Sequence, residues 1–266
     1  MFDIFSKKKT TKTIEYPPFS DIHCHMLSGL DDGAPDDNTM KAMIDMAYAY
    51  GTKTIAFTPH IRRPWLKRPD ADVVSSFERA CDYVQAHYGD MKLALGCEVY
   101  YYPDVFEEHG DIIRSYSNTD YLLVEFSPNN SYFDITSGLQ DVISRGYSPV
   151  LAHVERYPDL WKDIGRIYNV HQLGTLLQVN CDTLAAFGDK SVISSAVSPG
   201  RNFKKQMDSL LEDEMISFLS TDAHNLKERR PVMTAAYDYV IDICDSDYAD
   251  AIASENAVRM LKGEWI

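Results

Sequence analysis

Short β-rich runs alternate with amphipathic helical segments along most of the chain. The runs that favour strands span residues 54–60, 93–101, 121–127, 148–157, 176–181 and 217–224. Apolar residues recur at helical spacing within 36–52, 72–87, 136–145, 160–173, 203–211 and 232–244. Strands separated by helices pair in parallel through right-handed crossovers, so the alternation predicts an α/β barrel or an open doubly wound sheet.

Residues that can bind metal ions stand where most of these predicted strands end. They are His23 and His25 after an apolar lead-in, then His60, Glu98, Glu125, His153, Asp222 and His224. Barrels and doubly wound sheets both place ligand-binding residues at the carboxyl ends of their strands. We therefore expect these side chains to converge on one metal site.

The stretch DIHCHMLSGLDDG, at residues 21–33, carries the first part of this set. Successive side chains of a strand point to opposite faces, so His23 and His25 share one face while Cys24 points the other way. Taken alone, such a pair is equally compatible with ordinary surface histidines. The repeated strand endings in His, Asp or Glu favour the metal site.

The remaining histidines, His87, His109 and His171, fall in predicted helices or loops, and we interpret them as surface residues. Imidazole and carboxylate ligands without thiolate suit zinc, manganese or iron, and this mixture does not rank the three metals. The five cysteines are scattered and form no CxxC pair. Neither a disulfide framework nor a cysteine-based zinc site is therefore expected.

The formal net charge of -14 argues against non-specific binding to nucleic acid or to anionic membranes. No segment approaches the roughly 18 apolar residues of a membrane span, and the N-terminal stretch does not resemble a signal peptide. We expect a cytoplasmic protein with no membrane insertion. Residues 1–17 are interpreted as a tail and 18–266 as one domain, and the oligomeric state is left open.

The motifs, taken in order, resemble the PHP (polymerase and histidinol phosphatase) family. The HxH pair is followed by TPH at 58–60, GCEVYY at 96–101, AHVERY at 152–157 and STDAHN at 220–225. The DDG after HxH, with LLVEFS and PVLAHVERY, is more closely similar to the bacterial tyrosine-protein phosphatases of capsular and exopolysaccharide synthesis, of the CpsB and YwqE type. This resemblance covers nearly the whole chain after the tail. It implies a distorted, TIM-like (β/α)7 barrel with a trinuclear metal site.

The resemblance also implies how three divalent ions would be held, with manganese favoured and iron or zinc as alternatives. The first ion would bind His23, His25, Glu98 and Asp222. Glu98 would bridge to a second ion, which also binds Glu125 and His153, and the third would bind Asp32, His60 and His224. The choice of Asp32 over Asp31 stays open, because both suit a loop turn with Gly33.

Two arginines match the positions where the family holds phosphate: Arg156, in AHVERY, and Arg230, in NLKERRPV. The second segment looks one residue longer than in the relatives, so Arg229 is an alternative. None of the five cysteines has arginine six places on, as the loop of cysteine phosphatases requires. We hypothesise attack on phosphorus by a metal-bridging hydroxide, with the arginines orienting the phosphate oxygens and Asp222 as a candidate general acid.

The expected substrate is phosphotyrosine on the tail of a bacterial tyrosine autokinase of polysaccharide synthesis. The loop HIRRPWLKRPD supports peptide docking, since Arg62, Arg63 and Trp65 stand with further basic residues beside a metal ligand. A solvated loop with one packed tryptophan is the alternative. Rival functions are a small-molecule phosphatase, such as histidinol phosphatase, and a non-catalytic metal-binding or kinase-docking module, against which the full ligand set argues.

Overall fold

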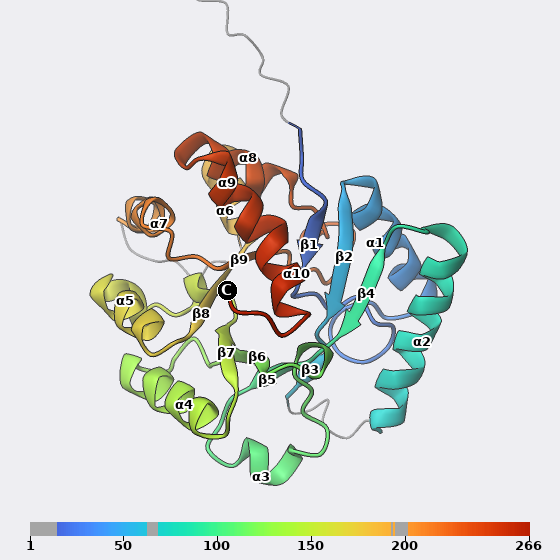
Figure 1. The fold of residues 1–266 in the computed structure, drawn as a ribbon, viewed down its shortest axis with the longest axis horizontal. Coiled ribbons are helices and arrows are strands. Elements are labelled where there is room, and N and C mark those ends of the chain that lie inside the picture. Colours follow the sequence, from blue (N-terminus) through green and yellow to red (C-terminus); the bar gives the residue numbers. More distant parts are fainter. Residues whose placement is uncertain (1–14, 63–68, 193, 195–201) are drawn as a thin grey trace, which may run out of the picture.

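The computed structural model describes residues 15–62, 69–192, 194 and 202–266. Most of the tail expected at 1–17 lies outside these residues, as do Arg63 and Trp65 of the proposed docking loop. The described chain forms a central set of strands with helices around it (Figure 1). Every strand pairing is parallel. The parallel α/β architecture expected from the sequence is therefore confirmed.

The strands form two parallel sheets. The smaller has the order β1-β2-β4 and contains β1 (Phe19–Asp21), β2 (Thr52–Phe57) and β4 (Lys92–Leu95). The larger follows chain order and contains β3 (His60–Ile61), β5 (Glu98–Tyr100), β6 (Tyr121–Glu125), β7 (Ser148–Leu151), β8 (Leu176–Asn180) and β9 (Phe218–Ser220). Both sheets thus run their strands toward the same end, where the candidate ligands lie.

Two predicted strands are each interrupted. The run at 54–60 becomes β2 and β3, separated by Thr58 and Pro59, and the run at 93–101 becomes β4 and β5, separated by Gly96 and Cys97. Pro59 has no N–H to donate, so it interrupts the ladder. Pairing resumes beyond both breaks, because His60 lies opposite Glu98 just as Phe57 lies opposite Leu95.

The described strands do not close into one continuous barrel ladder, so the expected closed (β/α)7 barrel is not confirmed. The first and last strands meet beyond their ends, where Cys24 forms an isolated parallel bridge with Ala223. Two backbone hydrogen bonds flank it: the His25 N–H donates to Ala223 O at 2.9 Å and the Asp222 N–H donates to His23 O at 2.7 Å. This contact brings the two ends of the chain to one site.

The helices cover the outer sides of the sheets. They are α1 (Asp37–Ala49), α2 (Asp70–His87), α3 (Val105–His109), α4 (Tyr132–Ser144), α5 (Gly165–Gln172), α6 (Cys181–Gly188), α7 (Phe203–Glu212), α8 (Thr234–Ile243), α9 (Ser246–Asp250) and α10 (Asn256–Met260). In α1 the buried face is the predicted one, with Met40, Met43, Ile44 and Ala47. The single helix expected at 160–173 is divided, because Asp163 is extended and its carboxylate accepts the Gly165 N–H.

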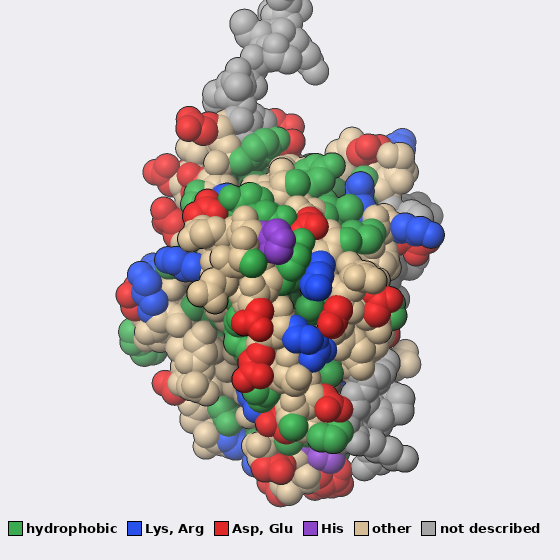
Figure 2. Space-filling view, turned by 90° about the vertical axis from the view of Figure 1, so that its right-hand side faces the viewer, with side chains coloured by type: hydrophobic (Ala, Val, Ile, Leu, Met, Phe, Trp, Pro, Cys, Tyr) green, Lys and Arg blue, Asp and Glu red, His purple; other side chains and the backbone are tan. Residues whose placement is uncertain are grey.

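None of the described helices is both long enough and apolar enough to cross a membrane. Acidic and basic side chains are interspersed on the face shown in Figure 2, on the side of α1 and α2. The described part of this face therefore carries no broad basic surface of the kind that binds nucleic acid.

Candidate metal centre

Nine histidine and acid side chains gather at the carboxyl ends of the strands. They fall into four overlapping groups in which the potential ligand atoms lie within 4.8 Å of one another. The groups are His25, Asp32, His60 and His224; His23, Glu98 and His153; His23, His25 and Asp222; and His60, Glu98 and Glu125. The structure thus brings together all nine residues that the sequence analysis named.

The HxH segment continues β1 with the alternation expected from its sequence. His23 and His25 are buried, and their Nε2 atoms lie 3.3 Å apart at the site. Cys24 points the other way, where it packs in the core with residues such as Met26 and Phe57. Its burial raises the pKa of the thiol well above the usual value. Cys24 is therefore a packing residue, not a soft ligand.

Glu98 lies at the centre of the cluster, where its carboxylate contacts four histidines. Its Oε1 atom lies 3.2 Å from His23 Nε2 and 3.1 Å from His153 Nε2. Its Oε2 atom lies 3.2 Å from His25 Nε2 and 2.9 Å from His60 Nδ1. Burial disfavours the Glu98 carboxylate, but the imidazoles of His23 and His60 outweigh burial and hold its pKa well below the usual value. A carboxylate with imidazoles on both oxygens is placed to bridge two cations.

Glu125, at the end of β6, has the opposite electrostatics. Burial, reinforced by repulsion from Glu98, raises the pKa of its carboxyl to about 8. Its Oε2 atom is buried and accepts no hydrogen bond, and its nearest cationic group is Arg62 Nη1 at 3.6 Å. A buried carboxylate oxygen with no donor fits a site that a cation completes.

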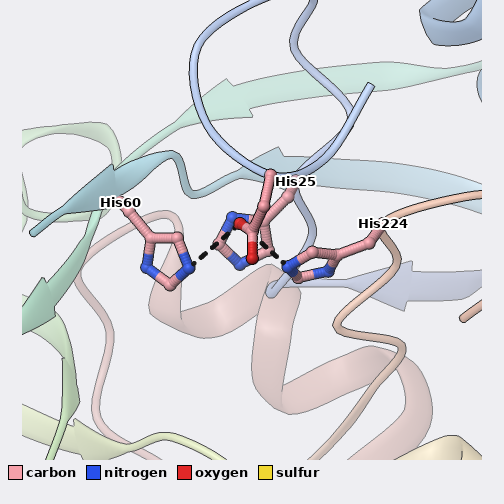
Figure 3. A group of neighbouring side chains, drawn as sticks. His25, His60 and His224 are labelled. Carbon is pink, nitrogen blue, oxygen red and sulfur yellow. Dashed lines mark ion pairs between the residues drawn. The ribbon is translucent and has the colours of Figure 1, made fainter. Parts of the chain in front are cut away.

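Asp31 and Asp32 divide two roles between them. The Asp31 carboxylate accepts the Gly33 N–H in a turn, and its Oδ2 atom lies 2.9 Å from His25 Nδ1. Asp32 Oδ1 instead faces the site, 3.5 Å from His60 Nε2 and 3.4 Å from His224 Nε2. Figure 3 shows the imidazoles of His25, His60 and His224 converging from three separate segments of the chain. Asp32 is thus placed as a ligand, and Asp31 holds the His25 ring.

The loop that carries both aspartates folds back onto the HxH segment. The Ala34 N–H donates to His25 O at 3.0 Å. A Cβ atom added at Gly33 would lie 1.8 Å from that same carbonyl oxygen, so only glycine fits there. The glycine of the DDG motif therefore lets the aspartates reach the histidines.

Three imidazole rings are oriented by hydrogen bonds at Nδ1, which leave Nε2 facing the site. The partners are Gln178 Oε1 for His23 at 3.0 Å, Asp31 Oδ2 for His25 at 2.9 Å and the Asp222 carbonyl for His224 at 2.8 Å. Such partners fix the ring orientation and tautomer of metal-binding histidines. The arrangement fits metal coordination through Nε2.

Strand β8 supplies residues that the sequence analysis missed. Gln178 Oε1 also accepts the His153 N–H at 2.7 Å, and Gln178 Nε2 donates to Asn180 Oδ1 at 2.9 Å. Asn180 Nδ2 in turn donates to Asp222 Oδ2 at 3.0 Å. The sequence did contain a signal for them. Gln178 and Asn180 are two residues apart, so they share one face of a strand whose other residues are apolar.

Two of the candidate ligands have left-handed backbone conformations. His153 has φ 34° and Asp222 has φ 49°, although neither is glycine. Each lies just beyond the end of a strand, β7 or β9, so the chain turns sharply where its side chain enters the site. A non-glycine residue held in the left-handed conformation destabilises the folded state by of order 1–3 kcal/mol, and such residues cluster at functional sites.

Two arginines reach the cluster, Arg156 from the short 3-10 helix Val154–Arg156 and Arg229 from the loop after Asp222. Arg156 Nη2 lies 2.8 Å from Asp222 Oδ2, and Arg229 Nη2 contacts the same oxygen. Burial alone would raise the pKa of Asp222, but these guanidinium groups outweigh it and hold the pKa well below the usual value. Arg230 is exposed and is not among the described residues that line the cavity at this site. The structure therefore places Arg229, and not Arg230, beside the candidate metal ligands.

A cavity of about 130 Å³ opens among these groups, with room for about four water molecules. Its lining residues are Asp32, His60, Arg62, Glu98, Glu125, His153, Arg156, Asp222, His224 and Arg229. The three remaining histidines lie elsewhere: His87 on α2 is exposed, while His109 on α3 and His171 on α5 are half-buried. The cavity thus combines cation ligands with three guanidinium groups, a combination suited to a phosphate group.

Residues 19–262 match the family described as capsular polysaccharide synthesis, CpsB/CapC. The chain belongs to the CpsB/CapC family. This match confirms the resemblance to proteins of the CpsB and YwqE type that the sequence motifs indicated.

Two relatives illustrate how far the similarity extends. The tyrosine-protein phosphatase CpsB of Streptococcus agalactiae serotype III (strain NEM316) is 28% identical over 250 residues, covering 92% of this chain and 99% of the relative. The tyrosine-protein phosphatase YwqE of Bacillus subtilis (strain 168) is 27% identical over 247 residues, covering 92% of each chain. Both similarities span the candidate metal centre.

Solved structures show the same fold. One from a study of YwqE from Bacillus subtilis and CpsB from Streptococcus pneumoniae, described as unique metal-dependent tyrosine phosphatases, matches with a TM-score of 0.79 and 26% identity. That match covers 92% of this chain and 95% of the other. A histidinol phosphate phosphatase from Lactococcus lactis, complexed with zinc, L-histidinol and phosphate, matches with a TM-score of 0.53 and 14% identity, covering 84% and 94%. The CpsB/CapC chain thus shares its fold with a wider group of phosphatases.

Proposed function

We propose that this CpsB/CapC chain is a metal-dependent protein-tyrosine phosphatase that hydrolyses phosphotyrosine. The observation that carries the proposal is the gathering of nine imidazole and carboxylate side chains around a cavity that Arg156 and Arg229 also line. Relatives that cover nearly the whole chain are tyrosine-protein phosphatases, which supports the same activity here.

We propose three divalent ions at this site, with manganese as the first candidate and iron or zinc as alternatives. The nine gathered side chains would hold them, with Glu98 as the bridging ligand because both of its oxygens face imidazoles. When bound, such ions supply an ionised water as nucleophile and neutralise charge on the phosphoryl oxygens. The mixture of nitrogen and oxygen ligands suits all three metals.

The protein's own residues would bind and orient the phosphoryl group. Arg156 and Arg229 present guanidinium groups whose paired N–H donors match two phosphate oxygens. In the structure both contact Asp222 Oδ2, so each is already aimed at the candidate metal ligands. A phenolate leaves readily, so a strong general acid is not needed. Because the arginines hold the pKa of Asp222 well below its usual value, a water molecule, and not the expected Asp222, is the candidate source of the proton.

We further propose that the physiological substrate is the phosphotyrosine-bearing tail of a bacterial tyrosine autokinase. The family's description, capsular polysaccharide synthesis, supports a role in that process. The position of Arg62 favours an anionic substrate, because its guanidinium group lines the cavity at the candidate metal centre.

For the fold, we propose that β2 with β3 and β4 with β5 each count as one interrupted strand. The nine strand segments then occupy seven positions, in keeping with a distorted (β/α)7 barrel whose seam is the bridge between Cys24 and Ala223. Slow amide exchange at His25 and Asp222, which donate across this seam, would support a closed barrel, and fast exchange would contradict it.

The test uses protein purified without chelator. Bound metal is measured by elemental analysis, and turnover is measured on a tyrosine-phosphorylated peptide and on histidinol phosphate. We expect bound divalent metal, turnover of the peptide that a chelator abolishes, and little turnover of histidinol phosphate. Preference for histidinol phosphate would indicate a small-molecule phosphatase, and bound metal without turnover of either substrate would indicate a non-catalytic module.

A further inference from the structure

A second, larger cavity adjoins the cavity at the candidate metal centre, the catalytic cavity. It measures about 490 Å³ and is lined by Arg62, Tyr100, Tyr102, Asp104 and Glu108. Arg62 lines both cavities, so its side chain stands between them. The catalytic cavity, at about 130 Å³, has little space beyond a phosphate group and its ligands. The rest of a phosphorylated substrate would extend beyond this cavity, and the larger cavity is a neighbouring space that can take it.

The strand β5 leads from one cavity to the other. Glu98 and Tyr100 are two residues apart and share a face of the strand, so Tyr100 lies roughly 7 Å further toward the carboxyl end. The intervening Val99 is buried in the core. The alternation continues past the strand, because Tyr101 points toward α4 and its hydroxyl donates to Asp141 Oδ2 at 3.1 Å, while Tyr102 lines the larger cavity. One face of this segment thus carries a candidate metal ligand and then two tyrosines.

Residues of the two neighbouring strands, β3 and β6, lie beside Tyr100 in the sheet. In β6, Glu125 is paired with Tyr100. In β3, His60 is paired with Glu98 and Ile61 with Val99, so the next residue, Arg62, falls beside Tyr100. The Arg62 guanidinium carbon lies 4.2 Å from the centroid of the Tyr100 ring, and Arg62 Nη1 lies 3.6 Å from Glu125 Oε2. Tyr100 and Glu125 therefore hold Arg62 at the boundary between the cavities.

We propose that this boundary is the binding site for the aromatic ring of the phosphotyrosine, with Tyr100 as a specificity-determining residue. The phosphate lies in the catalytic cavity, the ring stacks on the Arg62 guanidinium that Tyr100 supports, and the peptide continues into the larger cavity. The Arg62 side chain is 38% exposed, which leaves surface for this contact. A guanidinium held between two aromatic rings gains cation–π attraction on both faces. This inference rests on the proposed phosphatase activity.

The test compares Tyr100→Leu and Tyr100→Phe with the unaltered protein, all loaded with metal. Tyr100→Leu should raise KM for a tyrosine-phosphorylated peptide about tenfold, because it removes the ring beneath Arg62. Its inhibition constant for inorganic phosphate, which the metal ions, Arg156 and Arg229 would still hold, should change much less. Tyr100→Phe keeps the ring and should keep the KM. Tyr50→Leu, an exposed position at the end of α1, is the matched control and should change nothing.

Three results would overturn the inference. The first is an unchanged KM in Tyr100→Leu. The second is an equal loss of phosphate inhibition or of bound metal, which would show that Tyr100 supports the metal centre instead. The third is an equal rise of KM in Tyr100→Phe, which would assign the effect to the hydroxyl. Failure of the proposed function is distinguishable, since the unaltered protein would then fail to hydrolyse the peptide at all.

Discussion

At the scale of single residues, neighbouring side chains of one type take different roles because the backbone turns between them. Asp31 lies inward and holds the His25 ring, while Asp32 faces the cavity with a side chain that is 49% exposed. Burial raises the pKa of Asp32, but the hydrogen bond and charge of His224 outweigh burial and lower it to about 2. The sequence DDG could not decide between the two residues, since the distinction depends on how the loop folds onto His25.

Replacing Asp31 tests its role as the partner of His25. Asp31→Asn should lower metal affinity by about 10- to 100-fold, because it weakens the hydrogen bond that orients the ring. Affinity is measured by competition with a coloured chelator, with the exposed Asp111→Asn as control. Unchanged affinity in Asp31→Asn would limit this residue to the turn with Gly33.

The adjacent arginines Arg229 and Arg230 offer a matched pair. Arg229→Ala should lower kcat/KM for a tyrosine-phosphorylated peptide by at least about tenfold, roughly 1.4 kcal/mol, because a charged donor to the phosphate is lost. Arg156→Ala should have a similar effect. Arg230→Ala, at an exposed position, should have almost none, and metal content should stay the same in all three variants. A larger loss in Arg230→Ala than in Arg229→Ala would reverse the assignment.

At the scale of elements, β1 and the strands of the larger sheet contribute to the site through a residue at one end of the strand or just beyond it, or through side chains on the inner face. Candidate ligands lie in, or just beyond, the other six of these strands, whereas β8 carries Gln178 and Asn180 behind the ligands. The two amides connect His23, from the beginning of the chain, to Asp222, from near its end. Strand β8 therefore fixes the positions of groups that no local sequence holds together.

Removing the Gln178 amide tests this support. Gln178→Ala leaves the buried His153 N–H and His23 Nδ1 without their partner and should lower the free energy of unfolding by about 1–3 kcal/mol. Urea unfolding of the metal-free protein measures this change separately from any loss of metal. Gln172→Ala, at an exposed position at the end of α5, is the control. Equal stability of the two variants would contradict a supporting role for Gln178.

The sequence predicted six strand runs and six helices in their correct order, and it named all nine gathered side chains, but it did not predict α3, α6, α9 or α10. It could not predict where the strands stop, because His153 and Asp222 adopt left-handed conformations that no propensity of His or Asp requires. The choice of Arg229 depends on a tight turn, in which the Asn225 side chain accepts the backbone N–H of Arg229 at 3.3 Å and the His224 N–H donates to Arg229 O at 3.0 Å. A one-residue difference in the length of this segment changes which arginine the turn points toward the site, so the motif alone could not choose between Arg229 and Arg230.

At the scale of the whole molecule, the candidate metal centre concentrates negative charge inside a protein that is already acidic, with a formal net charge of -14. Asp31, Asp222 and Glu98 are buried carboxylates that lie close together, and Glu125 beside them has a raised pKa because a further negative charge is unfavourable there. Histidines and arginines offset part of this charge. Divalent ions would offset the rest, so stability should depend on metal.

Metal removal tests this dependence on the intact protein. A metal present at about 1,000 times its dissociation constant adds about 4 kcal/mol to the free energy of unfolding. For a protein of this size, that corresponds to a rise in Tm of roughly 10 °C. Calorimetry of the chelated and reloaded protein measures the shift, and a chelator saturated beforehand with metal is the control. Identical Tm values would show that the site binds no metal in the folded state.

The bridge between Cys24 and Ala223 also limits when the site can be assembled during synthesis. Asp21 accepts hydrogen bonds from Thr221, 200 residues later in the chain. His23 and His25 contact Asp222, and His25 also lies beside His224, in the same late segment. A ribosome exposes the first two histidines long before it has made their partners. A partly made chain therefore has only part of the candidate ligand set, and the set would be complete only after β9 and the residues that follow it have docked. If the proposed ions bind, metal loading would thus be a late step in the maturation of the protein, and a tightly held ion would mark a chain that has folded.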